Sequence, residues 1–204
     1  MIQLDSEVVV YINTNAKEKA LADCICTSAN APEVVNGMKS DTVIFGPDCN
    51  LGYYTQKKTD KKLVMVPEAG NCATHYDMSM SDLSEARKKH PDAKVIVHPE
   101  VIPELQEAAD AVGSTGGILK YCRESKDKEF IIGTENGMLY RLRNEMPGKE
   151  FYPLSERGVC PNMKKNTLEK LVKALESEEP EITVPEPIQA RSRSGIRRML
   201  ELTK

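Results

Sequence analysis

The cysteines are the side chains of this 204-residue sequence best suited to bind a metal or act as nucleophiles. There are six of them: Cys24, Cys26, Cys49, Cys72, Cys122 and Cys160. The chain is large for a disulfide scaffold, so each cysteine is first considered a buried apolar residue, a metal ligand or a nucleophile. Because a single free cysteine most often packs in a core, its place in the fold must decide whether it binds a metal.

Two cysteines are linked by an internal repeat. Four landmarks recur in the same order at offsets of 86 to 88 residues: Tyr11 and His98, Ser28 and Ser114, Gly46 and Gly133, and Cys72 and Cys160. This self-similarity indicates two copies of one unit, each closing on a cysteine. Thiolates at matching positions can converge on one metal centre, and a four-iron cluster held by three cysteines leaves one iron open to substrate. One period upstream of Cys72 falls before Met1, which predicts a third thiolate outside this chain.

The remaining cysteines have no cysteine partner in the repeat. We interpret them as core residues, including the C-x-C pair beside a short strand: Cys24, Cys26, Cys49 and Cys122. Cys72 and His75 have the C-x-x-H spacing of half a zinc site, but a second clear Cys/His pair is missing from the sequence. Zinc is therefore the weaker alternative.

The elements that must position these residues alternate between strands and helices. Apolar β-branched runs predict strands at 8–12, 42–45, 63–66, 94–97 and 130–132. Helical patterns lie around 16–22, 31–38, 81–90, 102–112, 116–123, 136–145 and 167–177. Such alternation is typical of parallel sheets covered on both faces. The predicted fold class is α/β, with two similar three-layer α/β/α units related by pseudo-symmetry.

Polar side chains follow the carboxyl ends of the predicted strands in both units, and open parallel sheets bind ligands at that edge. Units packed about a common axis would aim these groups into one cavity. They are Tyr11, Asn13, Ser28, Asn30, Asp48 and Cys72 in the first unit, and His98, Glu100, Ser114, Thr115, Glu135 and Cys160 in the second.

The composition argues against some classes of binding partner. A net charge of -3 gives no electrostatic reason to expect nucleic acid or an anionic membrane. Tryptophan is absent, which argues against a stacking platform for single-stranded nucleic acid. No apolar run approaches the roughly 20 residues that span a bilayer, and the first five residues lack the pattern of a signal peptide. We therefore expect a cytoplasmic protein without nucleic-acid or membrane partners.

Eight short segments carry most of these residues. They are VYINT at 10–14, CTSANA at 26–31, FGPDCNLG at 45–52, GNCATH at 70–75, VHPE at 97–100, ADAVGST at 109–115, IGTENG at 132–137 and CPNMK at 160–164. No single segment is decisive. As a set, in this order and over nearly the whole chain, they resemble the quinolinate synthase family.

The resemblance implies an enzyme of the transferase class that condenses iminoaspartate with dihydroxyacetone phosphate to quinolinate, phosphate and water in NAD biosynthesis. The family has three similar α/β domains around a central cavity, and a [4Fe–4S] cluster held by one cysteine from each. Cys72 and Cys160 match the second and third ligands, whereas the family's first domain has no counterpart here. Activity is therefore expected to need that missing N-terminal domain, and the imine would come from L-aspartate oxidase or aspartate dehydrogenase.

Site roles combine the resemblance with side-chain chemistry. Glu100 is the predicted acid/base, and His98 and His75 bind anionic groups or shuttle protons. The plainer interpretations are a solvated carboxylate, hydrogen-bonded structural histidines, a core aromatic for Tyr11 and helix caps for the hydroxyl residues. Six further residues are predicted to contact substrate: Tyr11 as a catalytic hydroxyl, and Asn13, Ser28, Ser114, Thr115 and Met163 as binding residues.

The repeat divides the chain into an expected first unit at 1–92, a second unit at 93–177 and a linker with an amphipathic helix at 178–204. Two other functions compete with the enzyme. One is a non-catalytic module that binds phosphate or dicarboxylate or senses iron, and the other is an inactive fragment.

Overall fold

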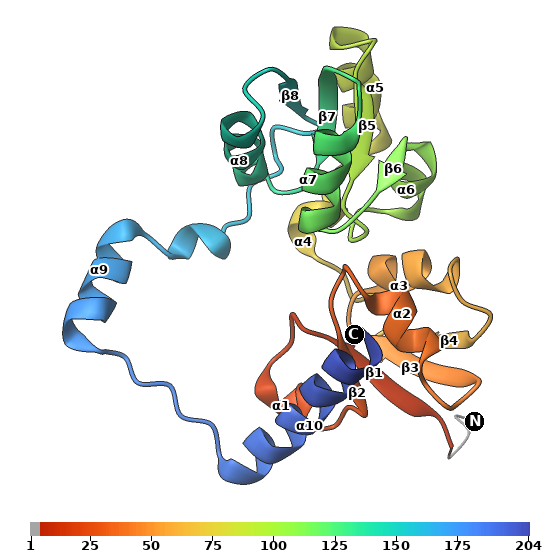
Figure 1. The fold of residues 1–204 in the computed structure, drawn as a ribbon, viewed down its shortest axis with the longest axis vertical. Coiled ribbons are helices and arrows are strands. Elements are labelled where there is room, and N and C mark those ends of the chain that lie inside the picture. The colour runs from red at the N-terminus through yellow and green to blue at the C-terminus, as the bar shows by residue number, and fades with distance from the viewer. Residues whose placement is uncertain (1–4) are drawn as a thin grey trace.

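The computed structural model describes residues 5–204 as two α/β units followed by a C-terminal segment (Figure 1). Each unit contains a four-stranded sheet whose strand pairings are all parallel. This arrangement confirms the α/β class and the two similar units. The signal-peptide expectation falls largely on residues 1–4, which lie outside the described residues. Within 5–204, the helices are too short or too polar to cross a membrane.

The first sheet has the strand order β2-β1-β3-β4. Its central strand places Val9 beside Cys24 on one side and Phe45 on the other, and all three side chains are fully buried. The strands are β1 (Glu7–Tyr11), β2 (Cys24–Cys26), β3 (Thr42–Gly46) and β4 (Lys62–Met65). The helices are α1 (Ala16–Lys19), α2 (Ala31–Asn36), α3 (Cys49–Gln56) and α4 (Ala73–Tyr76).

The second sheet repeats this order as β6-β5-β7-β8. Ile96, one repeat period after Val9, lies beside Ala111 and Ile132 in the equivalent register. The strands are β5 (Lys94–Val97), β6 (Ala111–Val112), β7 (Glu129–Gly133) and β8 (Glu150–Pro153). The helices are α5 (Met80–Lys89), α6 (Pro103–Ala108), α7 (Thr115–Glu124) and α8 (Gly137–Glu145), followed by the 3-10 turn η1 (Met163–Lys165).

Helix α5 packs with the second sheet although it precedes that sheet in the chain. Its buried side chains Leu83 and Ala86 belong to the same apolar cluster as Val95 and Val97 of β5. A Ser79–Asp82 capping box fixes where the helix begins. The division at residues 92 and 93 stays a prediction, and this packing favours a boundary nearer Asp77.

The chain leaves the second unit, forms α9 (Leu168–Ser177) and returns to the first unit as α10 (Glu186–Leu202), as Figure 1 shows. Met199 of α10 joins the first core, Ser192 Oγ donates to the Ala16 carbonyl at 2.9 Å, and Arg198 pairs with Glu7 at 2.5 Å. The first unit is therefore completed by the C-terminal end of the described chain.

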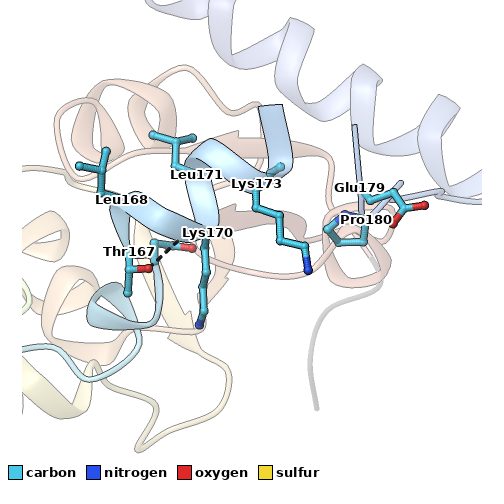
Figure 2. Close-up of a pocket in the computed structure, with 9 residues that line it drawn as sticks. Thr167, Leu168, Lys170, Leu171, Lys173, Glu179 and Pro180 are labelled. Carbon is cyan, nitrogen blue, oxygen red and sulfur yellow. Dashed lines mark hydrogen bonds between the residues drawn. The ribbon is translucent and has the colours of Figure 1, made fainter. Parts of the chain in front are cut away.

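Helix α9 presents apolar side chains that nothing in residues 5–204 covers. Leu168, Leu171 and Leu175 are 70%, 56% and 73% exposed, and their spacing puts them on one helix face. Figure 2 shows Leu168 and Leu171 on one side of α9 and Lys170 and Lys173 on the other, beside a hollow that Glu179 and Pro180 also line.

Some predicted boundaries were wrong. The helix expected at 102–112 ends at Ala108, because Asp110 bonds to Val95 through both its backbone N–H and its carboxylate and so draws Ala111–Val112 into the sheet. Helices α3 and α4 were not expected. The sequence of α3 contains Gly52 and two tyrosines, which are weak helix formers, and its cap at Asp48 and the burial of Leu51 stabilise it instead.

Candidate functional site

The predicted polar residues meet where the two units contact each other. Tyr11 ends β1, His98 and Glu100 follow β5, and Thr134 follows β7. His75 belongs to α4, the short helix after the first sheet. Its Nε2 lies 2.9 Å from Thr134 Oγ1 in the second unit. Strand ends of both sheets therefore supply one shared site.

Glu100 lies between two histidines. Its Oε2 is 2.9 Å from His75 Nδ1 and 3.6 Å from His98 Nδ1. The two imidazole rings stack with their centroids 4.8 Å apart. Exposed fractions of 4% for Glu100 and His98 and 7% for His75 mean that water has little access to these groups. The arrangement is a buried carboxylate–imidazole cluster.

The surroundings shift the pKa values of His75 and His98 in opposite directions. Burial opposes a charge on His75, but its hydrogen bonds to Cys72 and Glu100 raise its pKa to about 9. Burial, reinforced by the neighbouring His75 cation, lowers the pKa of His98 to about 4. The Glu100 backbone N–H donates to His98 Nδ1 at 3.3 Å, which requires an unprotonated nitrogen there. Near neutral pH the cluster thus holds one imidazolium and one neutral imidazole.

Glu100 stays ionised despite its burial. Burial raises the pKa of its carboxyl, but the hydrogen bond from His75 and the two nearby imidazoles hold the pKa below its ordinary value. The Tyr11 hydroxyl faces the same carboxylate and the Ser28 side chain. Burial and the Glu100 charge raise the pKa of Tyr11, so its proton stays on the phenol. The site therefore combines a base, Glu100, with a proton donor, His75, and a hydrogen-bond donor, Tyr11.

The two repeat-related cysteines border this cluster. Cys72 is the N-cap residue of α4, and its Sγ lies 3.2 Å from His75 Nδ1. Cys160 precedes η1, and hydrogen bonds from the Met163 backbone and the Thr74 side chain lower the pKa of its thiol. Because Thr74 is only two residues beyond Cys72, both cysteines lie in the same region of the molecule.

These features fit a thiolate-bound metal cluster. Cys72 and Cys160 are half-buried free thiols, one at a helix start and one facing backbone N–H groups that lower the pKa of the Cys160 thiol and so favour its thiolate. The other cysteines divide differently. Cys49, also predicted to be a core residue, is instead half-buried beside Asp48, whereas the three fully buried ones pack in the two cores, as predicted: Cys24, Cys26 and Cys122.

Cys72, His75 and Glu100 also offer three metal-ligating atoms within 4.8 Å of one another. The 2.9 Å between His75 Nδ1 and Glu100 Oε2 is shorter than the roughly 3.3 Å that separates two ligand atoms around a tetrahedral zinc ion. The distances suit a hydrogen-bonded group that shares the His75 proton, so zinc remains the weaker interpretation.

Several predicted substrate-binding residues are not drawn into the cluster. Asn13 is exposed just beyond β1, and Thr115 is exposed at the start of α7. Ser114 accepts from the Gly117 N–H as the N-cap of α7, which is the plainer role considered for it. Met163 is 56% exposed and is tied to Cys160 through its backbone. Their substrate contacts stay predictions.

Sequence reasoning assigned no specific role to three residues that the fold places at the site. Thr134 contacts His75, and the buried Asn50 side chain donates to the Glu100 carbonyl at 3.0 Å. Asp48 accepts the Cys72 backbone N–H at 3.0 Å. The available signal was the repeat, because Asp48 and Glu135 occupy matching positions and Thr134 directly precedes Glu135.

Comparison with known proteins identifies the family. A family model described as quinolinate synthetase A protein matches residues 3–201. The quinolinate synthase of Methanocaldococcus jannaschii is 48% identical over 202 residues, which cover 97% of this chain and 66% of the relative. That of Pyrococcus horikoshii is 46% identical over 200 residues, covering 98% and 66%, and that of Thermotoga maritima 48% over 198 residues, covering 97% and 66%. The chain thus spans just under two thirds of the length of these relatives. It belongs to the quinolinate synthetase A protein family.

Proposed function

We propose that this chain forms part of a quinolinate synthase, which condenses iminoaspartate with dihydroxyacetone phosphate to quinolinate, phosphate and water. The observation that carries the proposal is the buried cluster of Glu100, His75, His98 and Tyr11, which both units build beside two half-buried cysteines. Ring closure between these substrates needs repeated proton transfers and loss of water, and this cluster holds both proton acceptors and donors.

A [4Fe–4S] cluster is the cofactor that the cysteines would hold, with Cys72 and Cys160 as two ligands and a third thiolate from outside this chain. When bound, an iron without a protein ligand supplies Lewis-acid chemistry that favours departure of a hydroxyl group. The half-buried thiols and the N–H groups facing Cys160 support this assignment.

The protein residues divide the proton transfers between them. Glu100, held ionised, takes protons from carbon or nitrogen of the condensing substrates. His75, held protonated, returns them to the departing oxygen, and Tyr11 donates a hydrogen bond to a carboxylate or enolate oxygen. His98 stays neutral and orients Glu100.

Anionic groups of the substrates would bind at the rim. Ser28 lies beside Tyr11, and Asn13 and Thr115 offer exposed polar side chains at the carboxyl ends of the sheets. Ser114 caps α7, whose first N–H groups favour phosphate, and Met163 would contribute an apolar wall.

Activity would require a further unit ahead of this chain. The curated relatives are about half as long again as the matched segment, and α9 exposes an apolar face of Leu168, Leu171 and Leu175. Exposed apolar faces of this kind usually pack against another chain segment or domain. The same unit would supply the third thiolate.

Anaerobic reconstitution with iron and sulfide tests the proposal. The chain is loaded alone, and also after co-expression with the remaining third of the Methanocaldococcus jannaschii relative. We expect the chain alone to bind iron poorly and form little quinolinate, and the pair to show cluster absorbance and turnover. Full activity of the chain alone would refute the need for a third thiolate.

Cysteine variants of the paired protein sharpen this test. Cys72→Ser and Cys160→Ser should each lose the cluster absorbance, because each removes a ligand. Cys49→Ser is the matched control, since Cys49 is also half-buried and near the first unit's strand ends, and it should retain the cluster. Retention of the cluster in the Cys72→Ser and Cys160→Ser proteins would remove these residues from the ligand set.

A further inference from the structure

Two acidic residues occupy equivalent places in the two units. Asp48 lies two residues beyond the end of β3, and Glu135 lies two residues beyond the end of β7. Both are buried, at 4% and 8% exposure. A buried carboxylate is costly unless hydrogen bonds satisfy it, so the partners of these two show what the fold uses them for.

Two backbone partners of each carboxylate correspond, and Glu135 also pairs with Lys164 at 2.8 Å. Asp48 accepts the Leu51 N–H at 2.8 Å, capping α3, and accepts the Cys72 N–H at 3.0 Å with its other oxygen. Glu135 accepts the Gly137 N–H at 2.8 Å, at the start of α8, and the Cys160 N–H at 3.4 Å with its other oxygen. Each carboxylate therefore joins the start of a helix to the backbone of the unit's closing cysteine.

One further hydrogen bond reinforces each junction. The residue after the carboxylate donates its backbone N–H to the glycine two residues before the cysteine: Cys49 to the Gly70 carbonyl and Asn136 to the Gly158 carbonyl, both at 2.7 Å. The approach at Gly70 is so close that a Cβ there would lie 1.9 Å from the Pro47 carbonyl oxygen. Two hydrogen bonds thus hold each cysteine loop against the strand end of its own sheet.

We propose that Asp48 and Glu135 are positioning residues that set the places of Cys72 and Cys160 by binding their backbone N–H groups. The inference rests on the proposed function for its purpose, namely that the two thiols must be held for a shared cluster. Glu135 does not serve to activate the Cys160 thiol, because its negative charge raises the pKa of that thiol. The contribution proposed for both carboxylates is geometric.

Substitution by the isosteric amide separates the two hydrogen-bonding roles of each carboxylate, which are to cap the helix and to bind the cysteine N–H. In Asp48→Asn and Glu135→Gln, the remaining oxygen can still cap the helix, but the new NH2 group cannot accept the cysteine N–H. Asp110→Asn is the matched control. Asp110 accepts the Val95 N–H at 2.8 Å, and no hydrogen bond joins it to the described residues of either cysteine loop.

The experiment is amide hydrogen exchange of the 204-residue chain labelled with 15N-cysteine, which has six cysteine amides to follow by NMR. We expect Asp48→Asn to speed exchange at Cys72 roughly tenfold or more and to leave Cys160 unchanged, the scale of one lost hydrogen bond to a charged group. Glu135→Gln should do the reverse, with a smaller increase because its bond is longer. Asp110→Asn should change neither, and Cys122, buried in the second core, reports whether each variant stays folded.

Equal acceleration at both cysteines, or none, would overturn the proposal. If one amide variant does not fold, the other tests the same rule at its own cysteine. Iron content after reconstitution with the further unit is a separate measurement. If the reciprocal exchange pattern is found but no iron binds, the positioning role stands and the cluster proposal fails. If iron binds but the reciprocal pattern is not found, the cluster proposal stands and the positioning role fails.

Discussion

The two units share a scaffold but place different side chains at the same edge. Tyr11 and Asn13 in the first unit correspond to His98 and Glu100 in the second, one repeat period later. Strand order, register and the bonds that hold the cysteine loops agree between the units. The backbone framework has been kept, and the residues that do chemistry differ.

Asp48 and Glu135 also differ between the units, in the neighbours that set their pKa values. Burial raises the pKa of Asp48 to about 6, and no cation pairs with it among the described residues. Burial also raises the pKa of Glu135, but the ion pair with Lys164 and its backbone hydrogen bonds lower it below the ordinary value. A repeated framework therefore fixes where groups point, and their local neighbours decide how they titrate.

The largest expected effect compares Glu100 with its counterpart Asn13. In the active protein with its further unit, Glu100→Gln should lower kcat by about 100-fold to 10,000-fold while the cluster absorbance remains, because the base is lost. Asn13→Ala should raise KM by roughly tenfold with a small change in kcat, the loss of one hydrogen bond to an anion. Steady-state kinetics of both variants measure the contrast, and an equal fall in kcat would mean that the units share catalysis evenly.

The histidines offer a second contrast. In the chain without metal, we expect His75 to titrate with a pKa of about 9 and His98 with a pKa of about 4, on either side of the ordinary 6.5. Imidazole NMR resonances followed from pH 3.5 to 10 measure both. In Glu100→Gln the pKa of His75 should fall, since the carboxylate stabilises its charge. Two histidines that titrate together would contradict the division into donor and neutral partner.

The attachment of α10 distinguishes the first unit from the second. Burial raises the pKa of Glu7, but hydrogen bonds from Ser40 and Lys39 backbone groups and from Arg198 outweigh it and lower the pKa to about 2. Ionised Glu7 therefore stabilises the folded state fully above about pH 4.5. This contribution to the free energy of unfolding, on the order of 1–2 kcal/mol after solvent screening, is lost as the pH falls toward 2. Urea unfolding between pH 2 and 6 measures it. Arg198→Met should weaken this pH dependence, and an unchanged profile would show that α10 does not contribute to it.

The smallest effect is expected at the matching place in the second unit. Lys94 corresponds to Glu7 and pairs with Asp110 at 3.0 Å, but its side chain is 42% exposed. Lys94→Met should change the free energy of unfolding by less than about 1 kcal/mol, as is usual for an exposed ion pair. The same urea experiment serves here. A fall in the free energy of unfolding as large as that caused by Arg198→Met would mean that the two ion pairs stabilise their units equally.

The repeat carried most of what could be predicted about the site. Offsets near 87 residues are enough to single out Cys72, Cys160, His98 and Glu100, because a duplicated unit keeps its strand ends in register. Helix α3 and the early end of α6 escaped prediction, since the burial of Leu51 and the bonds between Asp110 and Val95 depend on packing with residues distant in the chain. Local propensity contains no information about such contacts.

The amino-acid sequence alone determined the α/β class, the two repeated units and the identity of most groups at the strand ends. These depend on local periodicity and on order along the chain, which a sequence displays directly. Only the tertiary structure decided that His75 of the first unit lies 2.9 Å from Glu100 of the second, and that Asp48 and Glu135 hold the cysteine loops. Protonation states and positions of this kind depend on burial and on partners dozens of residues away, and only packing brings those together.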